Sequence, residues 1–147
     1  MKKIAKDIKE SGKIAEIFLN ELLKNEDDLT GATVVALSGD LGAGKTAFTQ
    51  AVAKGLGIKN KVNSPTFVLI KKYSLKNDKY KYFFHIDAYR LKNEQELLHL
   101  GWNEIINNKE HLVFIEWPEI VKNVIPKYAK RISISHTKEG GREIEIH

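Results

Sequence analysis

The sequence contains no cysteine, which excludes disulfide bridges and zinc sites built on cysteine. Its five histidines are scattered and lack the spacing of a metal site. No apolar run approaches the ~20 residues that a membrane span needs, and the basic N-terminus lacks the apolar core of a signal peptide. These absences predict a cytoplasmic protein that is not associated with a membrane.

Arginine is also scarce, since only Arg90, Arg131 and Arg142 occur among the 24 basic residues. The formal net charge is +5, and the excess is concentrated between residues 54 and 90, where nine basic residues face two acidic ones. Such an uneven excess favours a polyanion or an acidic partner. A solvated lysine-rich surface is the simpler interpretation, because nucleic-acid contacts usually rely on arginine. Direct contact of this lysine-rich region with RNA stays open.

The length of 147 residues predicts one domain over residues 1–147, because domains cluster at roughly 100–200 residues. Apolar periodicity predicts the order of its elements. These are an amphipathic helix spanning Ile4 to Leu22, buried strands at 33–39 and 111–117, a helix ending near 55–57, a hairpin of 66–73 and 80–87, a short helix between Asn93 and Gly101, and a hairpin of 131–136 and 142–147. The sum is a mixed α/β domain with some parallel strands and two antiparallel hairpins.

The stretch "GDLGAGKT", residues 39–46, matches the pattern G-x-x-x-x-G-K-[ST] in full. It follows an apolar strand and precedes an amphipathic helix, which is the arrangement of a P-loop. Glycines allow backbone N–H groups to surround a polyphosphate, and the helix dipole favours the negative charge. We expect Lys45 to bind the β- and γ-phosphates and the hydroxyl of Thr46 to be a ligand of Mg²⁺. The alternative, a purely structural glycine turn, leaves the Lys-Thr pair unexplained.

Two carboxylates follow apolar strands and are candidates for the metal side of this site. Glu116 ends the run "HLVFIE", and α/β folds place ligand sites at strand ends; it is expected to hold Mg²⁺ directly or through water. Asp87 ends "FFHID" and is expected to orient the attacking water or to bind the metal through water. His85 lies two residues before Asp87 and could have a role in the site. A histidine that is simply hydrogen-bonded within the sheet is an equally good interpretation. Arg90 is expected either to pair with Asp87 or to reach the γ-phosphate.

The segment "NSPTF", residues 63–67, lies between the P-loop helix and the next strand. Many P-loop proteins have a mobile segment there that senses the γ-phosphate. Ser64 and Thr66 supply hydroxyls for that role, although a plain Ser-Pro turn explains the segment as well.

Taken in order, "GDLGAGKT", "NSPTF", "HIDAYRL", "LVFIEWPE" and "GREIEI" resemble the TsaE family (formerly YjeE) over nearly the whole chain. The resemblance implies a bacterial P-loop NTPase with a three-layer α/β/α fold and a mixed central sheet, which binds ATP and Mg²⁺. It also implies a role in forming N6-threonylcarbamoyladenosine beside the anticodon of ANN-decoding tRNAs. The implied partner is the TsaB–TsaD heterodimer, with tRNA reached indirectly through that complex.

The resemblance also implies residue roles. Asp87, Glu116 and Lys45 would be catalytic, Thr46 and Glu116 would hold the metal, and Ser64 and Thr66 would match a switch-like segment. Trp117 matches the family's E-W pair. The residues implied to contact the nucleotide are Gly39, Asp40, Leu41, Gly42, Ala43, Gly44, Lys45, Thr46 and Arg142. The chain departs from the family at Ile8, where the family often has a threonine near the adenine, so a hydroxyl contact with the base is lost here.

Three functions are compatible with these residues. The first is an ATPase that is slow alone and is stimulated by a partner, because a P-loop without a partner-supplied arginine lacks a rate factor of ~10³–10⁵. The second is a nucleotide-gated binding module with negligible hydrolysis. The third is a small-molecule kinase, which the shortage of arginine disfavours, because a kinase lid is expected to be rich in arginine.

Overall fold

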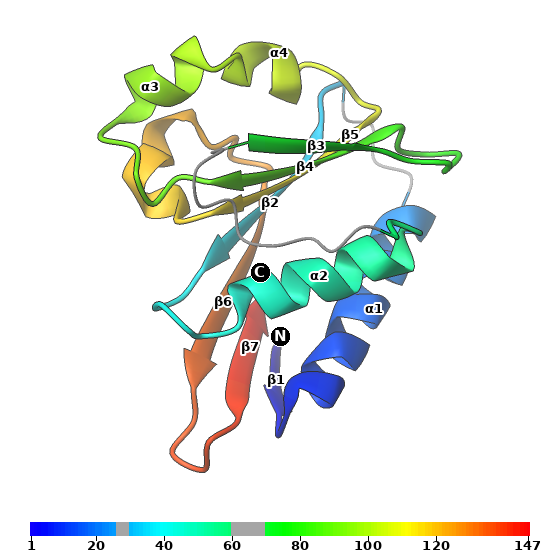
Figure 1. Ribbon diagram of the computed structural model, residues 1–147, viewed down its shortest axis with the longest axis vertical. Helices are drawn as coiled ribbons and strands as arrows, with labels where there is room; N and C mark the ends of the chain where they lie inside the picture. The colour runs from blue at the N-terminus through cyan, green and yellow to red at the C-terminus, as the bar shows by residue number, and fades with distance from the viewer. Residues whose placement is uncertain (26–29, 60–69) are drawn as a thin grey trace.

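The computed structural model describes residues 1–25, 30–59 and 70–147 (Figure 1). Within these residues, seven strands form one mixed sheet in the order β1-β7-β6-β2-β5-β4-β3. The strands are β1 (Lys2–Ala5), β2 (Thr33–Ser38), β3 (Ile70–Ser74), β4 (Tyr82–Asp87), β5 (His111–Glu116), β6 (Lys130–His136) and β7 (Arg142–Ile146). The helices are α1 (Ile8–Lys24), α2 (Lys45–Gly55), α3 (Glu94–His99), α4 (Trp102–Ile106) and the 3₁₀ segment η1 (Pro118–Val124).

The centre of the sheet is parallel and its margins are antiparallel. β2 pairs in parallel with both β6 and β5, and β5 pairs in parallel with β4. The hairpins β3–β4 and β6–β7 are antiparallel, as predicted. Every residue of β5 is buried, as expected of a strand covered on both faces. The carboxyl ends of β2, β5 and β4 therefore meet at one edge of the sheet.

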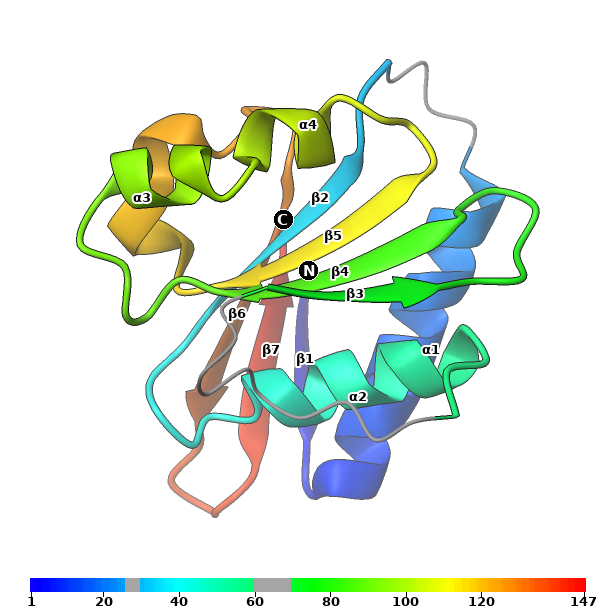
Figure 2. The ribbon, with the colours of Figure 1, turned by 45° about the horizontal axis from the view of Figure 1, so that its top comes forward.

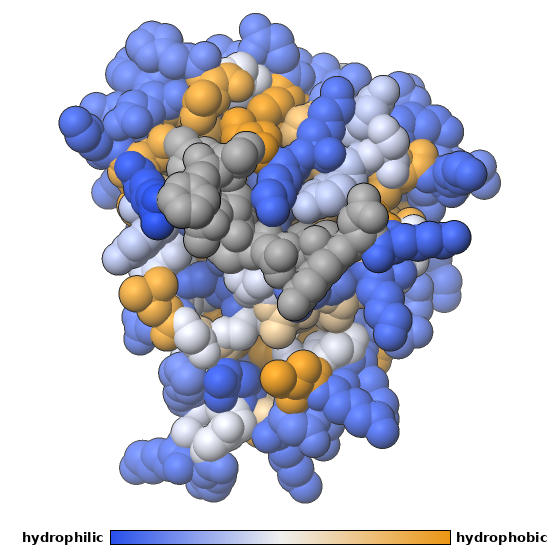
Figure 3. All heavy atoms as spheres, in the orientation of Figure 1, coloured by the Kyte–Doolittle hydropathy of each residue, from blue (hydrophilic) through white to orange (hydrophobic). Residues whose placement is uncertain are grey.

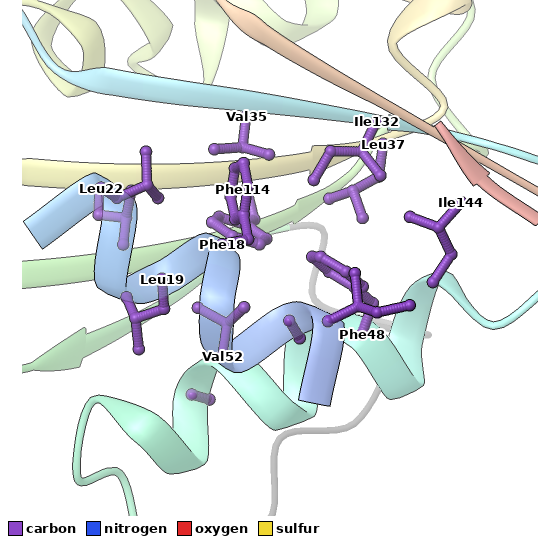
Figure 4. Packing of buried hydrophobic residues seen from close by; sticks show 14 of the residues in the cluster. Phe18, Leu19, Leu22, Val35, Leu37, Phe48, Val52, Phe114, Ile132 and Ile144 are labelled. Carbon is purple, nitrogen blue, oxygen red and sulfur yellow. The ribbon is translucent and has the colours of Figure 1, made fainter. Parts of the chain in front are cut away.

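Helices cover both faces of the sheet, which gives the predicted three layers (Figures 1 and 2). On one face, α1 and α2 bury Phe18 and Phe48 against Phe114 of β5 (Figure 4). On the other face, α3, α4 and η1 form a second core around the fully buried Trp102, whose indole N–H donates to the Val124 carbonyl at 3.0 Å. Most of the stability of such helices comes from burying an apolar face, so packing against the sheet holds them in place.

The N-terminal segment corrects one prediction. Ile4 belongs to strand β1 rather than to the first helix, and both Ile4 and Ile8 are exposed. Helix α1 begins only after Asp7, because the side chain of Asp7 caps it by accepting from the backbone N–H of Glu10 at 2.9 Å. The residues before this cap pair with β7 in antiparallel register, from Lys2 opposite Glu145 onward.

The short helix predicted after Asn93 is α3, and Asn93 caps it through the N–H groups of Gln95 and Glu96. The sequence did not indicate α4 or η1, which are short and cover the second core. Among the described residues, no helix combines the length and the apolar character needed to cross a bilayer.

Candidate functional site

The P-loop, residues 39–46, connects the end of β2 to the start of α2, as predicted. At Gly39 a side chain is impossible, because a Cβ there would collide with the backbone carbonyl oxygen of Ile134. Gly44 has a φ of 108°, a value that L-residues rarely adopt, and it leads directly into α2. These two glycines let the backbone turn tightly against β6 and present its amides at the end of the sheet.

The N-terminus of α2 is left free for an anion. Its cap residue is Gly44, no side chain caps the first turn, and the first turn contains no acidic residue. The N-terminal amides of a helix carry a partial positive charge and need an acceptor. An anion at this position would satisfy them.

Arg142 of β7 holds the P-loop from behind through backbone carbonyl groups. Its Nε donates to the Ala43 carbonyl at 2.8 Å and its Nη2 to the Gly42 carbonyl at 3.3 Å. A peptide unit whose C=O is bound on one side directs its N–H to the other side. Arg142 thus lies against the predicted nucleotide loop, where it fixes the orientation of two peptide units.

Lys45 is buried and lies close to both its own loop and an aromatic ring. Its ammonium group donates to the carbonyl of Gly39 and lies 3.5 Å from that of Asp40. The same nitrogen is 3.8 Å from the centroid of the Trp117 ring. Burial lowers the pKa of Lys45 from its ordinary value of 10.5, although the nearby carboxylates, Glu116 foremost, partly oppose this change. A polyanion in this place would favour the charged ammonium.

The two predicted carboxylates lie side by side at the ends of neighbouring strands. Asp87 of β4 is directly opposite Glu116 of β5, and Glu116 is opposite Leu37 of β2. Both acids line a cavity of about 250 Å³ together with Lys45 and Thr46. Its remaining lining residues are Leu41, Gly42, Ala43, Gly44, Tyr89 and Trp117. The strands thus bring together the acids that the sequence places 29 residues apart.

The donor set of this cavity fits a magnesium nucleotide. No group of three or more histidine or acidic side chains in the described residues could hold a metal ion by itself. Mg²⁺ is usually held by one or two protein oxygens together with substrate phosphates, rather than by a cage of side chains. The Thr46 hydroxyl and the Glu116 carboxylate meet that requirement beside Lys45.

His85 contacts the predicted metal ligand. Its Nε2 lies 2.5 Å from Oε2 of Glu116, and both side chains are almost completely buried. From the sequence, His85 was either a residue of the site or an ordinary hydrogen-bonded histidine of the sheet. The structure places it behind the site, in contact with Glu116.

A second cavity lies on the other side of the P-loop. It has a volume of about 630 Å³ and shares Gly42 and Gly44 with the first cavity. Its other walls are the start of α1 and the β6–β7 turn: Lys6, Asp7, Ile8, Lys9, Ser11, Ala47, Gly140, Gly141 and Arg142. Ile8, the position that the resemblance pairs with the base, thus lines this cavity with a side chain that cannot donate a hydrogen bond.

Two aromatic residues near the site had no assigned role from the sequence. The rings of Tyr89 and Trp117 lie 5.0 Å apart, and both residues line the smaller cavity. Trp117 is also the only non-glycine residue in the described chain with a positive φ, 59°. Their signal in the sequence is position, since Trp117 directly follows Glu116 and Tyr89 lies two residues after Asp87. Arg90 is exposed in the same turn as Tyr89, whereas Ser64 and Thr66 lie outside the described residues.

Part of the lysine-rich region has structural tasks. Lys79 donates to the carbonyls of Leu22 and Asn25 at the end of α1, where a cation is favourable. Lys81 donates to the Asn77 carbonyl at 2.9 Å. Hydrophilic side chains dominate the face in Figure 3, and apolar ones emerge only in separate small groups. These contacts favour the simpler interpretation of a solvated surface.

Comparisons with known proteins identify the family and the fold. The profile of the family described as "Threonylcarbamoyl adenosine biosynthesis protein TsaE" matches residues 5–144. The "tRNA threonylcarbamoyladenosine biosynthesis protein TsaE" of Bacillus subtilis is 40% identical over 111 residues, which are 76% of this chain and 66% of that protein. Its counterpart in Treponema pallidum is 37% identical over 118 residues, 80% of this chain and 84% of that protein. The crystal structure of Bacillus subtilis YdiB superposes with a TM-score of 0.75 and 28% identity, covering 98% of this chain and 82% of that one.

Proposed function

The chain belongs to the TsaE family of tRNA threonylcarbamoyladenosine biosynthesis proteins, and on that basis we propose that it is a cytoplasmic ATPase serving this modification. The observation that carries the proposal is the meeting of Lys45, Thr46, Asp87 and Glu116 in one cavity beside an uncapped helix N-terminus. The fold, a P-loop NTPase, supports the same conclusion.

We assign the triphosphate to the smaller cavity. The amides of Gly39–Thr46 and the N-terminus of α2 would surround the β- and γ-phosphates. Lys45 would turn its ammonium group from the carbonyls of Gly39 and Asp40 to the phosphate oxygens, which are stronger acceptors. Arg142 would act on the nucleotide through the loop carbonyls that it binds.

Magnesium, when bound, would neutralise charge on the phosphates and orient them for cleavage. We propose that Thr46 and Glu116 hold it, with Asp87 as the residue that orients the attacking water. This division agrees with burial, because Glu116 is enclosed whereas Asp87 is half-buried at the mouth. The Asp87 carboxylate already accepts from the backbone N–H of Tyr89 at 3.0 Å, which fixes its position.

The nucleoside is assigned to the larger cavity. That cavity adjoins the P-loop and begins where the phosphates would end, at Gly42 and Gly44. Ile8 offers only an apolar contact there. We therefore expect base preference to depend on backbone groups and on shape, and to be weaker than the preference for a triphosphate.

The partner that we propose is the TsaB–TsaD complex, with tRNA reached through that complex. An isolated P-loop site hydrolyses slowly when it lacks a stabilising arginine. The described arginines do not line the smaller cavity, so a partner would have to complete the site. This supports a partner-stimulated ATPase over a kinase that works alone.

The test is phosphate release from ATP with and without TsaB, TsaD and tRNA. We expect slow release by the chain alone and stimulation by the complex. Asp87→Ala should abolish the stimulation and leave ATP binding intact. Binding to TsaB–TsaD without stimulation would favour the nucleotide-gated module, whereas transfer of phosphate to a small acceptor would favour the kinase.

A further inference from the structure

The contact between His85 and Glu116 joins two adjacent strands directly beneath the proposed metal position. His85 is fully buried on β4, and its Nε2 reaches Oε2 of Glu116 on β5 at 2.5 Å. A carboxylate can only accept hydrogen bonds, so Nε2 carries the proton and donates it. Within the described chain, Oε2 is the only side-chain oxygen of Glu116 with a hydrogen bond, which leaves Oε1 for a ligand in the cavity.

The other ring nitrogen indicates that this histidine is not there for core stability. Nδ1 of His85 is buried and has no hydrogen-bond partner in the described part of the chain. A buried polar atom without a partner is unfavourable, and natural proteins keep such atoms only rarely. An apolar side chain would fill the same space without that cost. The contribution of His85 therefore comes from its bond to Glu116.

We propose that His85 is a positioning residue, which holds Oε2 of Glu116 so that Oε1 is presented to Mg²⁺ beside the Thr46 hydroxyl. This inference rests on the proposed function, because it assigns a task to His85 only if Glu116 binds the metal. Residues that orient metal ligands in this way typically contribute 10–100-fold to metal affinity. A glutamate without such a bond would lose rotamer freedom on binding the ion, and the bond to His85 removes part of that loss in advance.

His111 provides a matched control on the same sheet. It is also a buried histidine, at the opposite end of β5, and its Nδ1 donates to the Ile105 carbonyl at 2.8 Å. That contact satisfies a backbone group of α4 and lies away from the P-loop. Replacing His111 tests the effect of losing a buried histidine without touching the proposed metal site.

The experiment is calorimetric titration of ATP into the whole chain, once with Mg²⁺ and once with EDTA. For the unaltered chain we expect Mg²⁺ to raise ATP affinity. In His85→Leu we expect this Mg²⁺-dependent gain to fall about 10–100-fold, while the affinity measured in EDTA stays within about twofold. His85→Gln should recover part of the gain, because the amide nitrogen of glutamine can take the place of Nε2. His111→Gln should keep the full gain.

Three results would overturn the proposal. The first is a His85→Leu variant that keeps the full Mg²⁺-dependent increase in ATP affinity while Glu116→Gln loses it. That result would leave the proposed function intact. The second is an equal loss of affinity with Mg²⁺ and in EDTA, which would make His85 merely structural. The third is no Mg²⁺-dependent gain in the unaltered chain, in which case the proposed function fails as well. If His85→Leu does not fold, His85→Asn replaces it, because the shorter amide cannot reach Oε2.

Discussion

The ring of Trp117 covers the ammonium group of Lys45, with Nζ 3.8 Å from the ring centroid. Trp117 follows Glu116 directly and reaches this position in a left-handed backbone conformation. Its ring also packs on Tyr89, at the exposed mouth of the cavity. The lysine that should bind phosphate is therefore held by its own loop on one side and by an aromatic ring on the other.

Nucleotide binding should change the fluorescence of Trp117, because Lys45 must leave the face of the ring to reach the phosphates. The chain has only one other tryptophan, Trp102, which is fully buried in the second core. The measurement is a titration with MgATP that follows emission. Trp117→Phe should remove the change, and Trp102→Phe should keep it. A full change in Trp117→Phe would contradict the account.

Replacing Lys45 by methionine should separate function from stability. Burial lowers the pKa of Lys45, so the charged form disfavours folding below that pKa, and this cost disappears as pH rises toward 10.5. Lys45→Met should therefore unfold at a higher temperature than the unaltered chain at neutral pH, with the difference shrinking as pH rises. ATP affinity should fall by about tenfold or more, since a charge-assisted hydrogen bond is lost.

The control for this variant is Lys54→Met, which removes an exposed lysine near the other end of the same helix. Its melting temperature should differ from that of the unaltered chain by an amount that hardly depends on pH. A lower melting temperature for Lys45→Met at neutral pH would show that the buried ammonium group stabilises the fold, contrary to our expectation.

Arg142→Ala should loosen the P-loop before any nucleotide is bound. Losing the hydrogen bonds to the Gly42 and Ala43 carbonyls should destabilise the binding conformation of the loop by ~1–2 kcal/mol. This free energy is equivalent to about a 5–30-fold drop in ATP affinity. Hydrogen exchange should show faster exchange of the loop amides. Arg142→Lys should restore little, because lysine cannot form the forked contact. Exposed Arg131, replaced by alanine, is the control, and unchanged loop exchange in Arg142→Ala would contradict this role.

Gly39→Ala and Gly140→Ala form a matched pair. Both glycines have a positive φ, but only at Gly39 would the new Cβ meet the backbone of Ile134, whereas nothing lies within 4 Å at Gly140. We expect Gly140→Ala to cost ~1–2 kcal/mol of unfolding free energy from the φ value alone. Gly39→Ala should cost more and should also abolish ATP binding. Urea unfolding measures the difference, and equal costs for the two variants would refute the close approach.

Most of the site could be predicted from local patterns in the sequence. The P-loop could be predicted because its strand, glycines, lysine and helix are contiguous in the sequence. The neighbouring positions of Asp87 and Glu116 followed from two apolar strands that end in acids, since parallel strands end at the same edge of a sheet. In both cases the information lies within a few residues of the site.

Features that depend on distant pairing could not be predicted. Ile4 fits the helical spacing of α1, and only pairing with β7, at the other end of the chain, makes it part of a strand. The bond between His85 and Glu116 requires the register of β4 on β5. The contact of Trp117 with Lys45 requires a backbone conformation that is rare outside glycine, and no local pattern in the sequence predicts it.

A crystal structure with a non-hydrolysable ATP analogue and Mg²⁺ would test the proposed nucleotide site most directly. We expect the β- and γ-phosphates to lie within the amides of Gly39–Thr46, contacted by Lys45, with the metal held by Thr46 and Glu116. Phosphates bound elsewhere on the chain, or a metal ion with no contact to either of those two residues, would contradict it.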